Sequence, residues 1–210
     1  MKVKNTPLIK NGFILLMLTM ILTPAFFEEA GAVTLGDVSI PDTVTVSDTR
    51  LQLNGAGYRS KFIFKIYVGA LYTEKKVGSR DAVQALKGPK RVLMHMVYDE
   101  VSHAKMAAAW EEGFEENSSD TQLEKLQARL KTFIGYFPDL RAGDVVYLDY
   151  LPGKGTRVSI NNKTAGMIEG DDFYAALLDV WLGDEPADDD LKDAMLGKNG
   201  EEEAYQGSSD

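Results

Sequence analysis

The segment Leu53–Glu74, LNGAGYRSKFIFKIYVGALYTE, carries the clearest structural signal in the chain. Gly55 and Gly57 predict a turn at residues 54–57. The aromatic and β-branched residues that follow predict one long strand over residues 61–72. Because two lysines interrupt this apolar run, we expect one face of the strand to meet water or a polar cavity.

Arg59 stands between the predicted turn and the predicted strand, and it is the first candidate binding residue. A guanidinium keeps its charge and presents a planar fork of donors, so Arg59 could recognise a carboxylate or an enolate oxygen. Tyr67, on the same strand, could supply a second donor. The alternative is a surface arginine bonded to a carbonyl at the end of the strand, and the residues alone leave both open.

The rest of the chain alternates between strand and helix patterns. Residues 33–53 predict two short strands, and residues 91–98 predict another. Helical periodicity appears next, then an antiparallel meander over residues 144–168, and then helical periodicity again; the expected helices cover residues 102–117, 121–133, 172–182 and 188–196. This order predicts an α+β fold in which helices pack on one face of an antiparallel sheet.

The first 32 residues have the features of a secretory signal peptide. Lysines precede the apolar run FILLMLTMIL at residues 13–22, and Ala30-Gly31-Ala32 matches the small residues of a cleavage site. We expect cleavage near Ala32, a periplasmic or secreted protein, and no stable membrane anchor afterwards. The alternative is an uncleaved anchor, although the run is shorter than the roughly 20 residues that span a bilayer.

These boundaries leave one domain over residues 33–197, followed by an acidic tail at 198–210 whose composition predicts disorder. The whole chain has a formal charge of −9, and residues 1–32 carry +1, so the remainder carries −10. A strongly acidic domain argues against nucleic acid and against an anionic membrane as default partners, although a local basic pocket stays open.

Composition also excludes several kinds of site. The chain has no cysteine, which rules out disulfides, iron–sulfur clusters and cysteine nucleophiles. Its two histidines cannot build a multi-histidine zinc site, although one histidine with carboxylates could bind a metal. The chain has no G-x-S-x-G elbow and no P-loop spacing. We therefore expect no metal and no cofactor, and we assign no catalytic residue.

Several short motifs, taken in order, resemble the chalcone isomerase superfamily and its bacterial chalcone isomerase-like branch. They are Asn54-Gly55-Ala56-Gly57-Tyr58-Arg59, Leu71-Tyr72, Trp110-x-x-Gly113-Phe114, Gly143-Asp144, Pro152-Gly153-x-Gly155-Thr156 and Trp181-Leu182-Gly183. The resemblance implies an open-faced β-sandwich, with a large antiparallel sheet that is covered by helices on one face.

The resemblance also implies a cleft with identifiable residues. The family's cleft arginine corresponds to Arg59 and its cleft tyrosine to Tyr98. An asparagine and two threonine or serine positions of the flavonoid-cyclising members correspond to Lys105, Tyr67 and Val180. Lysine and valine cannot reproduce those hydrogen bonds. Tyr67, at the strand position, matches the tyrosine of the fatty-acid-binding branch, in which the arginine and a tyrosine hold a carboxylate.

Three hypotheses follow from the sequence. The first is a non-catalytic binder of a small amphipathic acid such as a fatty acid, in which Arg59 and Tyr67 hold the acidic head and Tyr98 and Lys105 line the cleft. The second is an isomerase or intramolecular lyase of chalcone isomerase type, with Arg59 holding an oxyanion and Tyr98 donating a proton. The third is a partner-binding structural protein that has a filled core.

Overall fold

The computed structural model describes Met1 and residues 31–198, and it confirms the predicted α+β class. The elements, in chain order, are β1 (Ala32–Leu35), β2 (Val38–Pro41), β3 (Thr43–Val46), β4 (Thr49–Lys61), β5 (Phe64–Thr73), α1 (Arg80–Ala85), β6 (Lys90–Met96), β7 (Glu100–Val101), α2 (His103–Asn117), α3 (Asp120–Ile134), β8 (Leu140–Arg141), β9 (Val145–Leu151), β10 (Gly155–Ile160), β11 (Lys163–Ile168), α4 (Asp171–Leu182) and α5 (Asp189–Met195).

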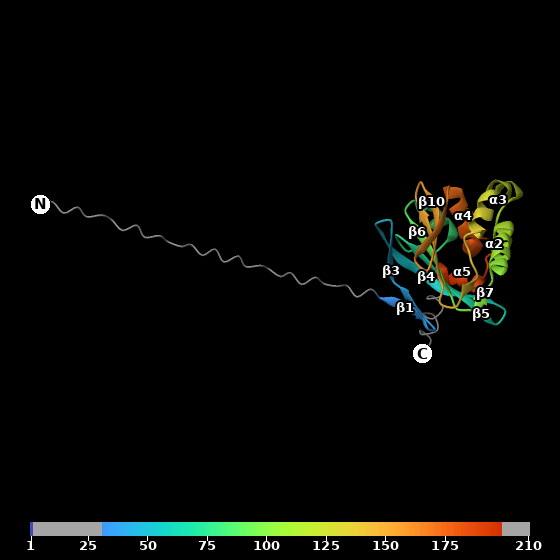
Figure 1. Cartoon of the computed structure of the whole chain (residues 1–210), viewed down its shortest axis with the longest axis horizontal. Coiled ribbons are helices and arrows are strands. Elements are labelled where there is room, and N and C mark those ends of the chain that lie inside the picture. The colour runs from blue at the N-terminus through green and yellow to red at the C-terminus, as the bar shows by residue number, and fades with distance from the viewer. Residues whose placement is uncertain (2–30, 199–210) are drawn as a thin grey trace, which may run out of the picture.

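The architecture is an open-faced β-sandwich. Seven antiparallel strands form one sheet in the order β11-β10-β9-β6-β5-β4-β3. The helices cover one face, where α4 lies between the sheet and the pair α2–α3 (Figure 1). The small β1–β2 hairpin covers only part of the opposite face, where Val38 and Ile40 pack on Val68 and Tyr72.

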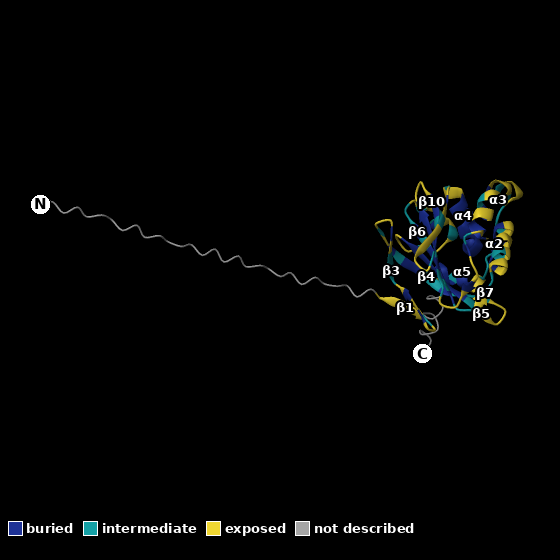
Figure 2. Ribbon diagram, in the orientation of Figure 1, coloured by how far each residue is buried: buried dark blue, intermediate teal, exposed yellow. Residues whose placement is uncertain are grey.

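Burial follows this layering (Figure 2). The main core lies between the sheet and the helices, and it contains an aromatic cluster in which Trp110 contacts Phe133 and Trp181 edge to face. Nine of the twelve residues of α4 are buried because this helix has protein on both sides, whereas α2 and α3 expose one face to water. Helix α4 therefore fixes the distance between the sheet and the outer helices.

The structure corrects the prediction for residues 54–72. Residues 54–57 are not a turn; they continue β4 through an irregularity between Leu53 and Gly55. The turn comes later, at Phe62 and Ile63, and it splits the predicted single strand into the end of β4 and the whole of β5. The run of apolar residues at 61–67 therefore contains a hairpin tip that hydrophobic periodicity alone did not reveal.

The two glycines in β4 have a packing role instead. A Cβ atom at Gly55 would lie 1.9 Å from the backbone oxygen of Ala194, and one at Gly57 would lie 2.6 Å from the Ala194 Cβ. Only a residue without a side chain lets α5 lie this close to the strand. The Asn54 side chain completes the contact, because its Nδ2 donates to the Met195 carbonyl at 2.7 Å.

The predicted ends of the chain fall largely outside the described residues. Of the predicted signal peptide, residues 1–32, only Met1, Gly31 and Ala32 lie among the described residues, and of the expected tail, residues 198–210, only Lys198 does. Among residues 31–198, no helix is both long enough and apolar enough to cross a lipid bilayer.

A row of charges crosses the sheet on the face away from the helices. Asp149 on β9 is opposite Arg91 on β6 and Arg157 on β10, and both guanidiniums donate two hydrogen bonds to its carboxylate. The Asp149 side chain is only 1% exposed. This row links three strands. It lies beside a cavity of about 570 Å³ on the open face of the sheet, which is lined in part by His95 and Tyr147.

We expect Asp149→Asn to lower the free energy of unfolding by about 3–5 kcal/mol, because it leaves the largely buried Arg91 without a counter-charge. Urea denaturation followed by circular dichroism measures this loss. The matched control is Asp172→Asn, which removes the more exposed ion pair with Arg129 and should cost about 1 kcal/mol or less. Equal losses in the two variants would contradict the structural role of the charge row.

Candidate functional site

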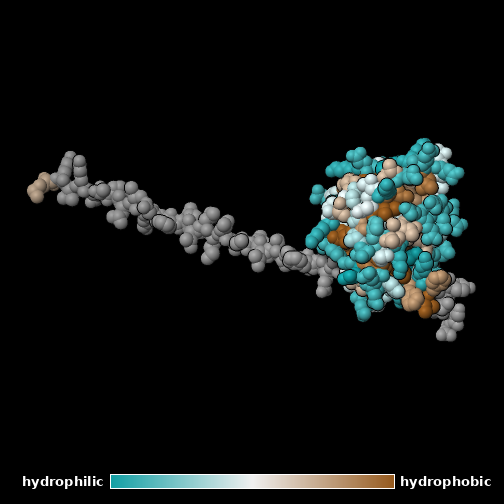
Figure 3. Space-filling view, turned by 45° about the vertical axis from the view of Figure 1, so that its right-hand side comes forward, coloured by the Kyte–Doolittle hydropathy of each residue, from teal (hydrophilic) through white to brown (hydrophobic). Residues whose placement is uncertain are grey.

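A cavity of about 640 Å³ lies on the helix-covered side of the sheet. Its walls come from the end of β4, the start of β5, the connection after β6, one side of α2, and the segment between α4 and α5. The core is thus not completely filled, whereas the partner-binding hypothesis required a filled core. The surface in Figure 3 is mostly hydrophilic, with hydrophobic side chains in its middle and at its lower edge.

All four residues predicted from the sequence line this one cavity. Arg59 and Tyr67 face each other across the β4–β5 ladder, Tyr98 follows β6, and Lys105 lies in the first turn of α2. Val180 of α4, which takes a polar position of the flavonoid-cyclising members, lines it as well. The structure brings these residues together, but it does not test whether they bind a ligand.

Arg59 is half-buried and has no counter-charge among residues 31–198. Within the described region its guanidinium makes no hydrogen bond or ion pair, and its Cζ lies 6.0 Å from the centre of the Tyr67 ring, at the outer limit of a cation–π contact. The alternative predicted from the sequence, an arginine bonded to a strand-end carbonyl, is therefore not what the structure shows. Its donors remain available to an anion in the cavity.

A strand irregularity sets the position of Arg59. The β4–β5 register shifts between Arg59 and Ser60, and the Ser60 amide donates to Asp188 Oδ2 at 2.8 Å. Asp188 also caps α5 by accepting from the Leu191 amide at 2.9 Å. Such a bulge re-aims the side chains beside it. The start of α5 thus holds the strand in the conformation that faces Arg59 into the cavity.

Tyr67 is 5% exposed, and its hydroxyl accepts a hydrogen bond from Trp181 Nε1 at 2.8 Å. Burial raises the pKa of the Tyr67 phenol, while the positive charge of Arg59 acts in the opposite direction. The phenol therefore stays protonated at neutral pH. Because its oxygen accepts from Trp181 and donates to no described residue, its hydrogen is free to bond an acceptor in the cavity.

Tyr98 and Lys105 lie toward the open side of the cavity. Tyr98 is half-buried and meets Phe64 edge to face, with ring centres 5.8 Å apart. Lys105 is exposed, so its ammonium group stays in water near the cavity wall.

The remaining wall of the cavity is mainly apolar, but it contains one hydrogen-bond donor that the sequence did not indicate. The apolar lining residues include Ile66, Met94, Val101, Met106, Ala109 and Trp110. The Trp110 Nε1 atom is buried and has no hydrogen-bond partner among the described residues. Buried donors are normally paired, so an unpaired indole N–H beside a cavity could serve a polar ligand. Only the packing of α2 on α4 reveals it.

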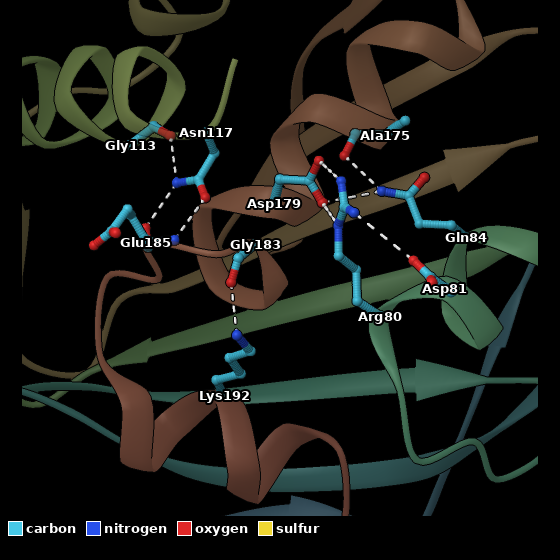
Figure 4. A network of polar contacts seen from close by, with 10 residues as sticks. All are labelled: Arg80, Asp81, Gln84, Gly113, Asn117, Ala175, Asp179, Gly183, Glu185 and Lys192. Atoms are coloured by element: carbon cyan, nitrogen blue, oxygen red, sulfur yellow. Dashed lines mark hydrogen bonds and ion pairs between the residues drawn. The ribbon is translucent and has the colours of Figure 1, made fainter. Parts of the chain in front are cut away.

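Polar contacts hold α4, the helix that carries Val180 and Trp181, against its neighbours (Figure 4). Asp179 accepts two hydrogen bonds of 2.6 Å from Arg80, and Gln84 donates to the same carboxylate at 3.0 Å. At the end of the helix, Lys192 of α5 donates to the Gly183 carbonyl at 2.7 Å. These bonds join α1 and α5 to α4, which keeps Trp181 within reach of Tyr67.

Asn117 at the end of α2 makes a similar link. Its amide nitrogen donates to the carbonyls of Gly113 and Glu185, and its oxygen accepts from the Glu185 amide (Figure 4). The segment after α4, which supplies Pro186 and Ala187 to the cavity wall, is thereby tied to α2. Across the described part of the chain, no group of three or more histidine, aspartate or glutamate side chains could hold a metal ion.

Comparison with known proteins agrees with this architecture. A crystal structure of a fatty-acid-binding protein from Arabidopsis thaliana resembles the chain with a TM-score of 0.60 and 16% sequence identity, over 83% of this chain and 100% of that one. At this identity the likeness shows a shared fold. A search of curated proteins finds no match. The family described as chalcone isomerase-like matches residues 32–197, so the chain belongs to the chalcone isomerase-like family.

Proposed function

We propose that the protein is a non-catalytic carrier of a small amphipathic acid, most simply a fatty acid. The observation that carries the proposal is Arg59, a half-buried cation with no ionic partner among the described residues, in the wall of a largely apolar cavity. A structurally similar protein of the same fold is a fatty-acid-binding protein, which supports this class of ligand.

The head of such a ligand would bind to Arg59 and Tyr67. A carboxylate that accepts from the Arg59 guanidinium and from the Tyr67 hydroxyl would gain two charge-assisted hydrogen bonds, which are about twice as strong as neutral ones. Trp181 already donates to the Tyr67 oxygen, and this contact orients the hydroxyl hydrogen away from α4. The ligand would also supply the negative charge that Arg59 lacks.

The tail would lie along the apolar wall. A volume of about 640 Å³ falls within the usual range of small-molecule pockets, about 300–1,000 Å³. Met94 from the sheet and Met106 from α2 contribute flexible side chains that can adapt to tails of different length. Burial of each methylene group contributes about 0.8 kcal/mol, so affinity should rise with chain length until the cavity is full.

We expect Arg59→Gln to weaken fatty-acid binding about ten- to hundredfold, because hydrogen bonds to a charged group contribute about 1.5–3 kcal/mol. Isothermal titration calorimetry or displacement of a fluorescent fatty acid measures the change. The matched control is Arg50→Gln, at the other end of the same strand, which should bind as the wild type does. Unchanged affinity in Arg59→Gln would overturn the assignment of Arg59.

We also propose that the protein acts outside the cytoplasm, on the basis of the charged, apolar and small-residue regions of residues 1–32. Cleavage after Ala32 would remove only the pair Ala32↔Pro41 from the β1–β2 hairpin, and the pairs from Val33↔Ile40 to the turn would remain. Expressed in an exporting host, the protein should be recovered from the soluble extracytoplasmic fraction with Val33 as its first residue, as intact mass measures. An unprocessed chain in the membrane fraction would support the uncleaved anchor instead.

A further inference from the structure

The β4–β5 hairpin ends in an exposed apolar tip, Lys61-Phe62-Ile63-Phe64-Lys65. Phe62 is 91% exposed, Ile63 88% and Phe64 51%, whereas the most exposed large apolar residues elsewhere in residues 31–198 are Val33 and Met167, at 41% and 38%. Single exposed apolar residues are ordinary, but three in succession at the end of a hairpin mark an interaction site.

The strands present this tip as an ordered structure. The β4–β5 ladder continues to the pair Lys61↔Phe64, so only Phe62 and Ile63 lie in the turn. Phe62 has a φ of 56°, in the left-handed region that bulky residues rarely occupy. Glycine would fit this position without strain. A phenylalanine there adds apolar surface at the very end of the hairpin.

The tip is continuous with the cavity. Phe62 and Phe64 both line it, and Phe64 packs against Tyr98 on its open side. Ile63 does not line the cavity and points its side chain into solvent. A surface that covered the tip would therefore meet the cavity opening, and a ligand could pass between the two without crossing water.

The charge of the tip indicates what that surface is. Lys61 and Lys65 are both exposed and flank the three apolar residues, although the domain as a whole is acidic. The nearby Glu100 is paired with Arg141 at 3.1 Å. Aromatic and aliphatic side chains between lysines suit the boundary between lipid headgroups and acyl chains. Residues 61–65 contain no carboxylate, and salt screens charges beyond about 8 Å, so the two lysines set the charge at the very end of the hairpin.

We propose that this tip docks the protein on an anionic lipid surface. Phe62, Ile63 and Phe64 enter the headgroup–acyl boundary, and the two lysines meet lipid phosphates. Glu112 and Glu116, which line the cavity from α2, disfavour deeper contact, so the attachment is shallow and reversible. This inference rests on the proposed function, because docking opens the cavity toward the store of fatty acid in the bilayer.

The test is flotation with large unilamellar vesicles of phosphatidylglycerol and phosphatidylethanolamine, with all variants prepared in the same N-terminal form. We expect the wild type to float with the vesicles and Ile63→Ser to lower vesicle partitioning about tenfold or more, because it removes one buried aliphatic side chain. Since Ile63 does not line the cavity, its affinity for a fluorescent fatty acid in lipid-free buffer should not change. Met167→Ser, an exposed apolar residue on β11, should match the wild type in both assays.

A second variant separates this inference from the proposed function. Ala109→Trp fills the cavity from α2 and should abolish fatty-acid uptake while vesicle partitioning is kept. Docking is overturned if the wild type does not float, or if Ile63→Ser floats equally well, whatever the fatty-acid affinity. Ile63-dependent flotation without fatty-acid uptake by any form would support docking and overturn the proposed carrier function.

Discussion

The candidate site depends on the pairing of β4 with β5, which sets Arg59 opposite Tyr67 on the helix-covered side of the sheet. From Gly55 to Arg59 the pairing is regular, and it then shifts where Asp188, at the start of α5, accepts a hydrogen bond from the Ser60 amide. Helix α5 can reach that position only because Gly55 and Gly57 leave room for Ala194. A side chain at either glycine would displace α5, and with it the bulge that positions the arginine.

The site combines a rigid frame with an unsatisfied charge. The Asp179 contacts with Arg80 and Gln84 hold α4, and through Trp181 they hold the Tyr67 hydroxyl. Arg59, in contrast, lies in the wall of a largely apolar cavity and makes no hydrogen bond or ion pair with a described residue. Removing a cation from water without a partner is unfavourable. A ligand that brings a carboxylate relieves this cost, which gives a physical reason for an acidic ligand.

Part of this arrangement could be predicted from the sequence. The α+β class followed from alternating and helical periodicity. The family motifs pointed to Arg59, Tyr67, Tyr98 and Lys105, and these residues line one cavity. The glycines at residues 54–57 were misassigned to a turn, since a sequence does not show which glycines make room for a distant helix. The hairpin at Phe62 was missed because its residues have the composition of a strand.

Other features depend on contacts that no local pattern encodes. Asp179 and Arg80 are 99 residues apart, and Trp181 and Tyr67 are 114 apart. The unpaired indole N–H of Trp110 becomes visible only when α2 packs against α4. The sequence could therefore name the residues of the site, but only the three-dimensional structure shows that Arg59 has no partner in the described region.

Native mass spectrometry of the protein, purified after export and without detergent, tests the central claim most directly. The account predicts a wild-type mass increased by one acidic lipid of a few hundred daltons, on the order of a pocket-sized ligand. The same preparation of Arg59→Gln should show the bare chain. A bare mass in both proteins, with no uptake of added fatty acid by the wild type, would contradict the account.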